Sequence, residues 1–169
     1  AGTYFGQSVA ISGDYVIIGA YSDDTGGTNS NRGIAYIFRR DTNAETWSQQ
    51  TVFQSNDIAN SDEFGYSVSI SGEYAIIGAR FEDPDGTNAA GSAYIFKRIG
   101  TTWTQQAKLV SGDKITGDEF GYSVSIDGSY AIVGARYQDL GALAVSNAGS
   151  AYIFVRNGDT WSEQAKLEA

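Results

Sequence analysis

The chain has 169 residues, of which 41% are hydrophobic and 13% aromatic, enough for one globular domain with a substantial core. Its net charge of -9 argues against a nucleic-acid partner, which needs clustered Lys and Arg. The chain has no cysteine, which excludes disulfides and thiolate metal sites, and it contains no run of ~18 apolar residues that could span a membrane.

One pattern of residues recurs three times along the chain. Each copy opens with Phe-Gly, at Phe5, Phe64 and Phe120, and runs to an apolar stretch that ends in Gly-Ala. A Gly-x-Ala-Tyr-Ile-Phe segment and a Trp-x-x-Gln segment follow in every copy. A repeat of this length indicates an array of supersecondary units that bury their faces against one another. The sequence predicts a single repeat domain over 1–169, with units over about 1–60, 61–116 and 117–169.

Each copy contains four strand-like runs, which the second copy illustrates in chain order. Their residues are β-branched and aromatic, and turn sequences around Gly72 and Gly100 separate the first pair and the last pair. The unit is therefore predicted to be a four-stranded antiparallel meander. In the second copy the runs cover 66–70, 74–79, 92–97 and 103–109.

The second run of each copy, at 75–79 in the middle one, does not alternate apolar with polar residues, so we expect it to be covered on both faces. In the first run, Ser67 and Ser69 alternate with Val and Ile, as expected where strands crowd toward an axis. Twelve strands and a single proline predict an all-β protein, a β-propeller or propeller segment of three four-stranded antiparallel blades. The alternative is a twelve-stranded solenoid, although solenoid coils usually repeat in fewer residues.

These motifs carry a family resemblance. The Phe-Gly start and the Ile-Ile-Gly-Ala end resemble the FG-GAP repeat of the integrin α-subunit propeller, and more closely its shorter bacterial relatives. The bacterial type shares the later Ala-Tyr-Ile-Phe and Ala-Lys-Leu segments. The resemblance implies a β-propeller at the cell surface or outside the cell, with a role in adhesion. The integrin calcium loop, Asp-x-Asp-x-Asp-Gly, is missing between the first two strands of every copy, so the resemblance implies no calcium binding there.

Three blades would leave two blade faces open, because closed propellers have four to eight blades. Exposed apolar faces of that size are rare on soluble monomers. Two copies could form a six-bladed ring, the chain could belong to a longer protein, or copies could add head to tail as a fibre. An unusually apolar loop in the third copy could cover a neighbouring subunit, or pack on its own blade. Its candidate self-association residues are Leu140, Leu143 and Val145.

Acidic residues gather in the loops between the second and third strands. In the second copy, Asp83, Asp85 and Asn88 present oxygen ligands around a glycine, which is part of what Ca²⁺ requires. The alternative is a solvated loop in an acidic protein. The sequence requires no cofactor, and calcium is its candidate metal. The candidate calcium ligands are Asp23, Asp24, Asp83, Asp85, Asn88 and Asp139.

The residues that follow the Gly-Ala motif are candidates for ligand binding. Arg80 and Phe81 in the second copy, and Arg136 and Tyr137 in the third, lie next to the long acidic loops. Arginine there could grip a carboxylate or sulfate group of a protein or glycan. The alternative is that both arginines pair with neighbouring acids. The three repeated tryptophans suit either a stacked glycan or packing between blades, and packing is the favoured interpretation.

Catalysis has little support, because the chain has neither His nor Cys. The adjacent acids of Asp62-Glu63 would point to opposite faces of a strand, so we interpret them as turn residues. We expect a non-enzymatic, extracellular or cell-surface module that binds a protein or glycan ligand in adhesion. The alternative is a self-assembling structural subunit of a surface filament or lattice, built through head-to-tail blade contacts.

Overall fold

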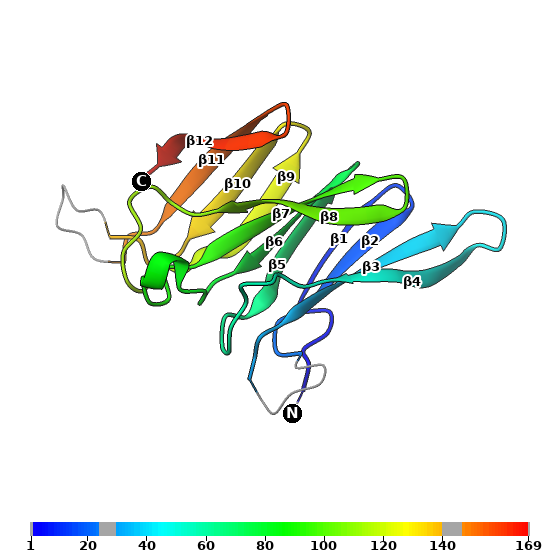
Figure 1. Ribbon diagram of the computed structural model, residues 1–169, viewed down its shortest axis with the longest axis horizontal. Helices are drawn as coiled ribbons and strands as arrows, with labels where there is room; N and C mark the ends of the chain where they lie inside the picture. The colour runs from blue at the N-terminus through cyan, green and yellow to red at the C-terminus, as the bar shows by residue number, and fades with distance from the viewer. Residues whose placement is uncertain (1, 24–29, 140–146, 169) are drawn as a thin grey trace.

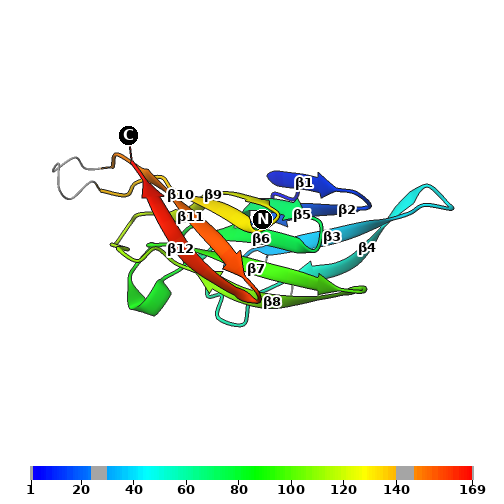
Figure 2. The ribbon, with the colours of Figure 1, turned by 90° about the horizontal axis from the view of Figure 1, so that it is seen from above.

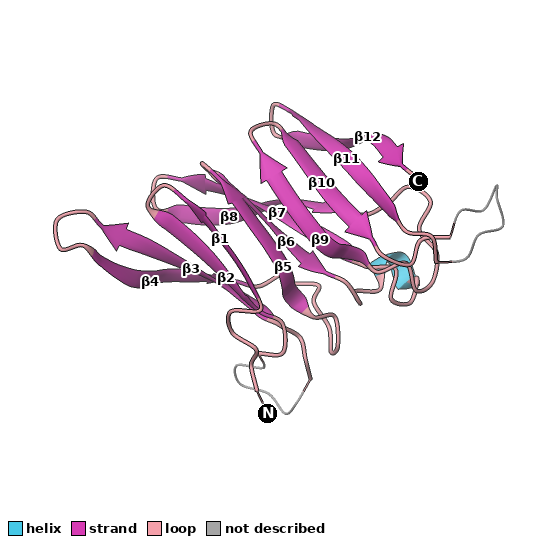
Figure 3. Ribbon diagram, turned by 180° about the vertical axis from the view of Figure 1, so that it is seen from behind, coloured by secondary structure: helices cyan, strands magenta, loops and turns pink. Residues whose placement is uncertain are grey.

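The computed structural model describes residues 2–23, 30–139 and 147–168, which form three four-stranded antiparallel sheets. The sheets lie side by side as three blades (Figures 1 and 3). A short 3-10 helix, Pro84–Gly86, is the single helix of the described residues, and it is far too short to cross a membrane. The strands are β1 (Ser8–Ser12), β2 (Tyr15–Ala20), β3 (Ile34–Asp41), β4 (Thr46–Phe53), β5 (Phe64–Ser71), β6 (Tyr74–Ala79), β7 (Ser92–Ile99), β8 (Thr102–Leu109), β9 (Phe120–Asp127), β10 (Tyr130–Ala135), β11 (Ser150–Asn157) and β12 (Thr160–Leu167).

Each sheet draws its four strands from one copy of the sequence repeat, in the order of a meander. The middle sheet pairs β5 with β6 from Ser71↔Tyr74 to Phe64↔Ala79, so the start of β5 lies beside the end of β6. The third and fourth strands of every sheet share one irregularity, which falls between Ile95 and Phe96 in the middle blade. The three copies therefore agree in backbone detail as well as in sequence. The all-β blade architecture predicted from the repeat is confirmed.

The first strands of the three blades, β1, β5 and β9, lie next to one another along one side of the molecule (Figure 2). Glycine makes their close approach possible. A Cβ atom on Gly78 would lie 2.0 Å from the backbone oxygen of Gly121 in the next blade, and one on Gly19 would lie 2.0 Å from that of Gly65. A larger residue at either position would push neighbouring blades apart.

Two apolar clusters hold the three blades together. One joins blade 1 to blade 2, and the other joins blade 2 to blade 3. Every residue of β6 is buried, which confirms the expected cover on both faces for the middle blade. In β2 and β10 burial is incomplete, because each outer blade has a neighbouring blade on one side only.

The two outer faces leave large apolar side chains in solvent. On blade 1, Val9 and Ile11 are 63% and 65% exposed, whereas their counterparts in blade 2, Val68 and Ile70, are both 6% exposed. On blade 3, Tyr130 is 54% exposed. The difference follows from position in the array, since the residue types are the same or similar.

Candidate functional site

Aromatic rings line the long-loop end of all three blades, and in blades 2 and 3 they alternate with guanidinium groups. Tyr66 and Tyr122 lie near the starts of β5 and β9, and Arg80 and Arg136 follow the ends of β6 and β10. Antiparallel pairing brings these positions to one end of each blade. We call this set the tyrosine–arginine row. Its members are Tyr4, Tyr21, Tyr66, Arg80, Tyr122 and Arg136.

The row is held together by cation–π and ring contacts. The guanidinium carbon of Arg80 lies 3.9 Å from the centre of the Tyr66 ring and 5.7 Å from that of Tyr122. The Tyr66 and Tyr122 rings are themselves 5.2 Å apart, centre to centre. The guanidinium carbon of Arg136 lies 4.9 Å from the Tyr122 ring. Distances below about 6 Å place both arginines within cation–π range.

In blade 1, aromatic rings replace the charged residues found at this end of blade 2. Tyr21 occupies the sequence position of Arg80, and Tyr4 that of Glu63. The rings of Tyr4 and Tyr21 stack with their centres 5.0 Å apart, and Tyr21 meets the edge of Tyr66 at 5.4 Å. The row is therefore aromatic at one end and cationic at the other.

Arg80 bridges the acids of two blades. Its Nε donates to Glu63 Oε2 at 2.8 Å, and its Nη1 lies 3.6 Å from Glu119 Oε2 in the next blade. Burial alone would lower the pKa of Arg80, but the hydrogen bond to Glu63 and the nearby negative charges raise it. Burial raises the pKa of Glu119, although both arginines oppose that shift. Arg80 thus pairs with neighbouring acids, which was the alternative to a role in ligand binding.

Arg136 is more available than Arg80. It is exposed, its Nη1 donates to the Tyr122 hydroxyl at 3.0 Å, and its guanidinium carbon lies 4.7 Å from the Tyr137 ring. No ion pair between described residues involves it. Burial raises the pKa of Tyr66 to about 12, and its hydrogen bond with Tyr122 adds to the shift. Tyr66 is therefore neutral at physiological pH, and Arg136 presents its charge beside the Tyr122 ring.

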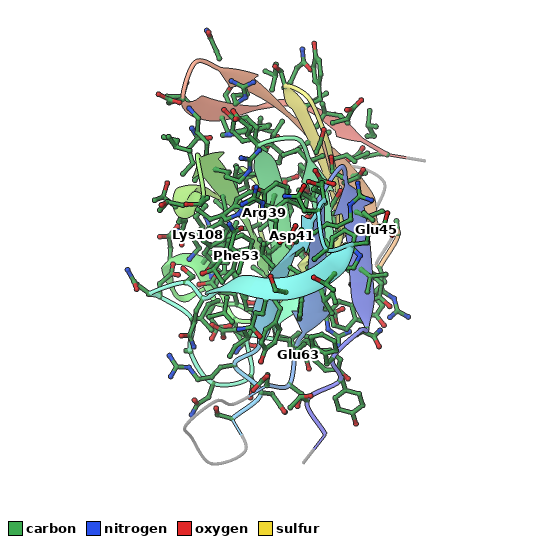
Figure 4. All side chains as sticks on the ribbon, turned by 90° about the vertical axis from the view of Figure 1, so that its right-hand side faces the viewer. Arg39, Asp41, Glu45, Phe53, Glu63 and Lys108 are labelled. Atoms are coloured by element: carbon green, nitrogen blue, oxygen red, sulfur yellow. The ribbon has the colours of Figure 1, made fainter. Side chains whose placement is uncertain are left out.

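Two of the predicted ligand residues, Arg80 and Arg136, come together around the Tyr122 ring, at 5.7 Å and 4.9 Å from its centre. Among the ring contacts of the described residues, Phe81 and Tyr137 each contact only the arginine that precedes them. Tyr66 and Tyr122 are members of the site that sequence reasoning missed. A signal was present, because tyrosine follows Phe-Gly in both the second and the third copy. In Figure 4, the labelled Glu63 lies at the long-loop end of the blades, away from Arg39 and Asp41 near the β3–β4 hairpin.

The candidate calcium ligands have structural partners in two of the loops. Asp83 Oδ1 accepts the backbone N–H of Ala89 at 2.6 Å, and Asp139 Oδ1 accepts that of Asn147 at 2.7 Å. These equivalent aspartates each close the loop between the second and third strands. The side chain of Asp23 is buried and accepts a hydrogen bond from the Tyr36 hydroxyl.

Asp85 contributes to an ion pair, with its Oδ2 at 3.2 Å from Lys114 Nζ. The backbone oxygen of Asn88 accepts the N–H of Gly117 at 3.0 Å. Within residues 2–23, 30–139 and 147–168, no three acidic side chains are grouped so that they could hold a metal ion. Calcium binding therefore stays a prediction. Asp24, like the predicted self-association residues Leu140, Leu143 and Val145, lies outside the described residues.

Comparison with known proteins identifies the repeat. The FG-GAP repeat model matches residues 1–38, 47–96 and 103–154, most of the chain. The chain belongs to the FG-GAP repeat family. A search of curated proteins gave no match. Among solved structures, the fold is similar to the crystal structure of Saccharomyces cerevisiae Sqt1, with a TM-score of 0.58 and 9% sequence identity. The match covers 99% of this chain and 36% of that one, so the FG-GAP chain spans about a third of its length.

Lysines of the fourth strand pair with acids of the long loops, both within and between the FG-GAP blades. Lys108 Nζ lies 2.8 Å from both Asp57 Oδ2 and Glu82 Oε1, and Lys166 Nζ lies 2.8 Å from Asp113 Oδ2. Burial alone would lower the pKa of Lys108, but its two carboxylate partners raise it. These repeated pairs reduce the negative charge at the long-loop end of the blades.

The repeated tryptophans pack between FG-GAP blades. Trp103 lies 5.4 Å from the ring of Phe53 in the preceding blade, and its Nε1 donates to Gln50 Oε1 at 3.3 Å. Trp161 Nε1 donates to Gln106 Oε1 at 3.0 Å. The packing interpretation accounts for both residues. Trp47 is covered by no other blade of the described residues and is 43% exposed.

Proposed function

We propose that the chain is a non-enzymatic, extracellular or cell-surface adhesion module that binds an acidic glycan on the tyrosine–arginine row. One observation supports this proposal most strongly. Arg136 is exposed, lies against the Tyr122 ring and makes no ion pair within the described residues. A guanidinium group offers paired donors to carboxylate or sulfate, and the neighbouring rings offer flat apolar faces to a sugar.

The state of the acids at the row supports a binding role over a catalytic one. Both acids face Arg80, which is hydrogen-bonded to Glu63 at 2.8 Å and lies 3.6 Å from Glu119, so each faces a positive charge that a general acid or base would have to share. Membership of the FG-GAP family supports the extracellular assignment, because these repeats are typical of extracellular proteins.

Binding to a panel of carboxylated, sulfated and neutral oligosaccharides tests the proposal. We expect carboxylated or sulfated glycans to bind and neutral ones to bind weakly. Arg136→Ala should reduce affinity at least about tenfold, because a hydrogen bond to a charged group contributes about 1.5–3 kcal/mol. Arg39→Ala, which removes the same charge at the hairpin end, is the matched control and should leave affinity unchanged. Equal losses in both variants, or no binding to any acidic glycan, would refute the proposal.

A second candidate function is that of a structural subunit which assembles through its blade faces. Exposed apolar residues on both outer blades, Ile11 and Tyr130 among them, favour it. Electron micrographs of the purified chain distinguish the two functions. Filaments or a lattice support the structural subunit, whereas compact particles that bind acidic glycans support the adhesion module.

A further inference from the structure

The two interfaces inside the chain repeat one set of contacts. In each, a tryptophan of the later blade donates its indole N–H to a glutamine of the earlier blade, as Trp103 does to Gln50 and Trp161 does to Gln106. The same tryptophan meets the edge of a tyrosine ring of the earlier blade. The ring centres are 6.0 Å apart for Tyr15 and Trp103, and 6.1 Å for Tyr74 and Trp161.

A hydrogen bond at the hairpin end is also repeated. The backbone N–H of Gly72 donates to Ser12 Oγ at 3.1 Å across the first interface. The N–H of Gly128 donates to Ser71 Oγ at 3.4 Å across the second. The two interfaces therefore share one packing arrangement between consecutive FG-GAP blades of this chain.

The outer faces of blade 1 and blade 3 each present the residues for one side of these contacts, without the residues of the other side. Trp47, on the outer face of blade 1, is the counterpart of Trp103 and Trp161, and no other blade within residues 2–23, 30–139 and 147–168 covers its indole. Gln164 and Tyr130, on the outer face of blade 3, are the counterparts of Gln106 and Tyr74, and both are exposed. Blade 1 therefore lacks an acceptor for its tryptophan, and blade 3 lacks a tryptophan for its glutamine and tyrosine.

Exposure separates the matched from the unmatched apolar residues. Phe5 is 51% exposed, whereas its counterpart Phe64 is fully buried at 0%. Leu167 is 49% exposed, whereas its counterpart Leu109 is 3% exposed. Each outer face thus keeps the apolar residue that its inner counterpart buries against a neighbouring blade.

Glycines on the outer face of blade 3 also indicate that a further blade could dock there. A Cβ atom on Gly91 would lie 2.0 Å from the backbone oxygen of Phe120 in the next blade. At the counterpart Gly149, the atoms of the described residues nearest to such a Cβ belong to the backbone of its own blade, with the oxygen of Arg136 at 3.0 Å. Gly134, the counterpart of Gly78, likewise meets only Ser123 of its own blade among the described residues. Blade 3 therefore keeps the room that an incoming backbone occupies at the inner interfaces.

We propose that the outer face of blade 3 of one copy docks onto the outer face of blade 1 of a second copy, in the register of the two inner interfaces. The inference rests on the second candidate function, self-assembly, and specifies its contact. Trp47 then donates to Gln164 of the other copy and packs on its Tyr130. A second copy of this chain is a sufficient partner, because the chain carries the residues of both sides of the contact, one side on blade 1 and the other on blade 3. Two copies joined at both ends form six blades, within the range of closed propellers.

Solution mass, measured by light scattering over a range of concentrations, tests the docking. We expect a mass of two or more chains, and a single chain for Ile11→Arg, because that charge would be buried without a partner. Ile99→Arg is the matched control, since Ile99 is similarly exposed but lies at the β7–β8 hairpin. A monomeric wild-type chain would overturn the proposal. So would an association that survives Ile11→Arg or is lost equally in the control.

Disulfide trapping tests the register, and the absence of native cysteine makes its outcome clear. The N–H of Val68 donates to Ser8 Oγ at 3.0 Å, so Ser8→Cys/Val68→Cys is an internal positive control. The counterparts across the proposed contact are Ser123 and Val9.

We expect a mixture of Ser123→Cys chains and Val9→Cys chains to give a covalent two-chain species on oxidation. Neither variant should give it alone. If the chains associate but this cross-link does not form, the proposed register is wrong, although self-assembly is still supported. If the cross-linked species are compact particles, filaments are excluded and the docking contact is supported.

Discussion

The middle blade and the outer faces contain nearly the same residues in opposite environments. Phe64 and Phe120 are fully buried between blades, while Phe5, which opens the first copy, is half exposed. Ile70 and Ile126 are buried, and Ile11 is exposed. The comparison teaches that the burial of a repeated residue depends on its neighbouring blade, because each blade has two faces and can cover neither by itself.

The largest expected effect is the loss of an interface aromatic ring. Phe64→Ala should lower the free energy of unfolding by about 3–5 kcal/mol, because it leaves a cavity between blades 1 and 2. Phe5→Ala should cost about 1 kcal/mol or less, since Phe5 is already half exposed in the folded chain. Urea unfolding at low protein concentration measures both. Similar losses in the two variants would mean that position in the array does not govern stability.

A methyl group at the blade axis should have the next largest effect. Gly78→Ala should destabilise the chain by about 1–3 kcal/mol, because the new Cβ would overlap the Gly121 backbone oxygen. Gly134→Ala should cost less, since its new Cβ meets the Ser123 hydroxyl, which can rotate away. Thermal unfolding of both variants distinguishes the sites. If Gly134→Ala is as destabilising as Gly78→Ala, the outer face of blade 3 is covered in solution.

Asp62, just before the first strand of the middle blade, should make the free energy of unfolding depend on pH. It is buried, and burial raises its pKa to about 6, with nearby Glu82 adding to the shift. The folded state therefore holds this proton more tightly than the unfolded state. Stability that Asp62 provides when protonated is lost as the pH rises from about 4 to about 6.

The variant Asp62→Asn keeps a side-chain oxygen for the Ala59 N–H and removes the buried charge. At pH 7.5 we expect it to be more stable than the wild type by about 1–2 kcal/mol, and near pH 4 the difference should disappear. Chemical unfolding at several pH values measures this. Asp159→Asn, at an exposed position, is the control and should not stabilise the chain. A constant difference at every pH would show that the effect is not due to ionisation.

The smallest expected effect comes from the indole hydrogen bond. Trp103→Phe removes the bond to Gln50 and should cost about 1 kcal/mol beyond the lost packing area. Trp47→Phe should have almost no effect in a single chain. At concentrations where copies dock, Trp47→Phe should weaken association about fivefold, a shift that light scattering can detect. No change in association would contradict the predicted Trp47–Gln164 contact.

Much of the fold could be predicted from the sequence because the strand signals are local. The runs predicted at 74–79 and 103–109 became β6 and β8, with a difference of one residue at the start of β8. The site was predicted only in part. Arg80 and Arg136 were found from their position after Gly-Ala, but Tyr66 was not, since its contact with Arg80 exists only after β5 and β6 pair.

The sequence by itself determined the family, the three blades and the order of their strands, because each follows from a repeated pattern of neighbouring residues. The tertiary structure alone decided which copies of that pattern are buried, because burial requires a second blade at the right distance. It also showed that Arg80 is held by Glu63 and Glu119 while Arg136 is exposed. These two arginines occupy equivalent positions in sequence. Arg80 has Glu119 of the following blade within 3.6 Å, whereas no following blade among the described residues offers an acid to Arg136.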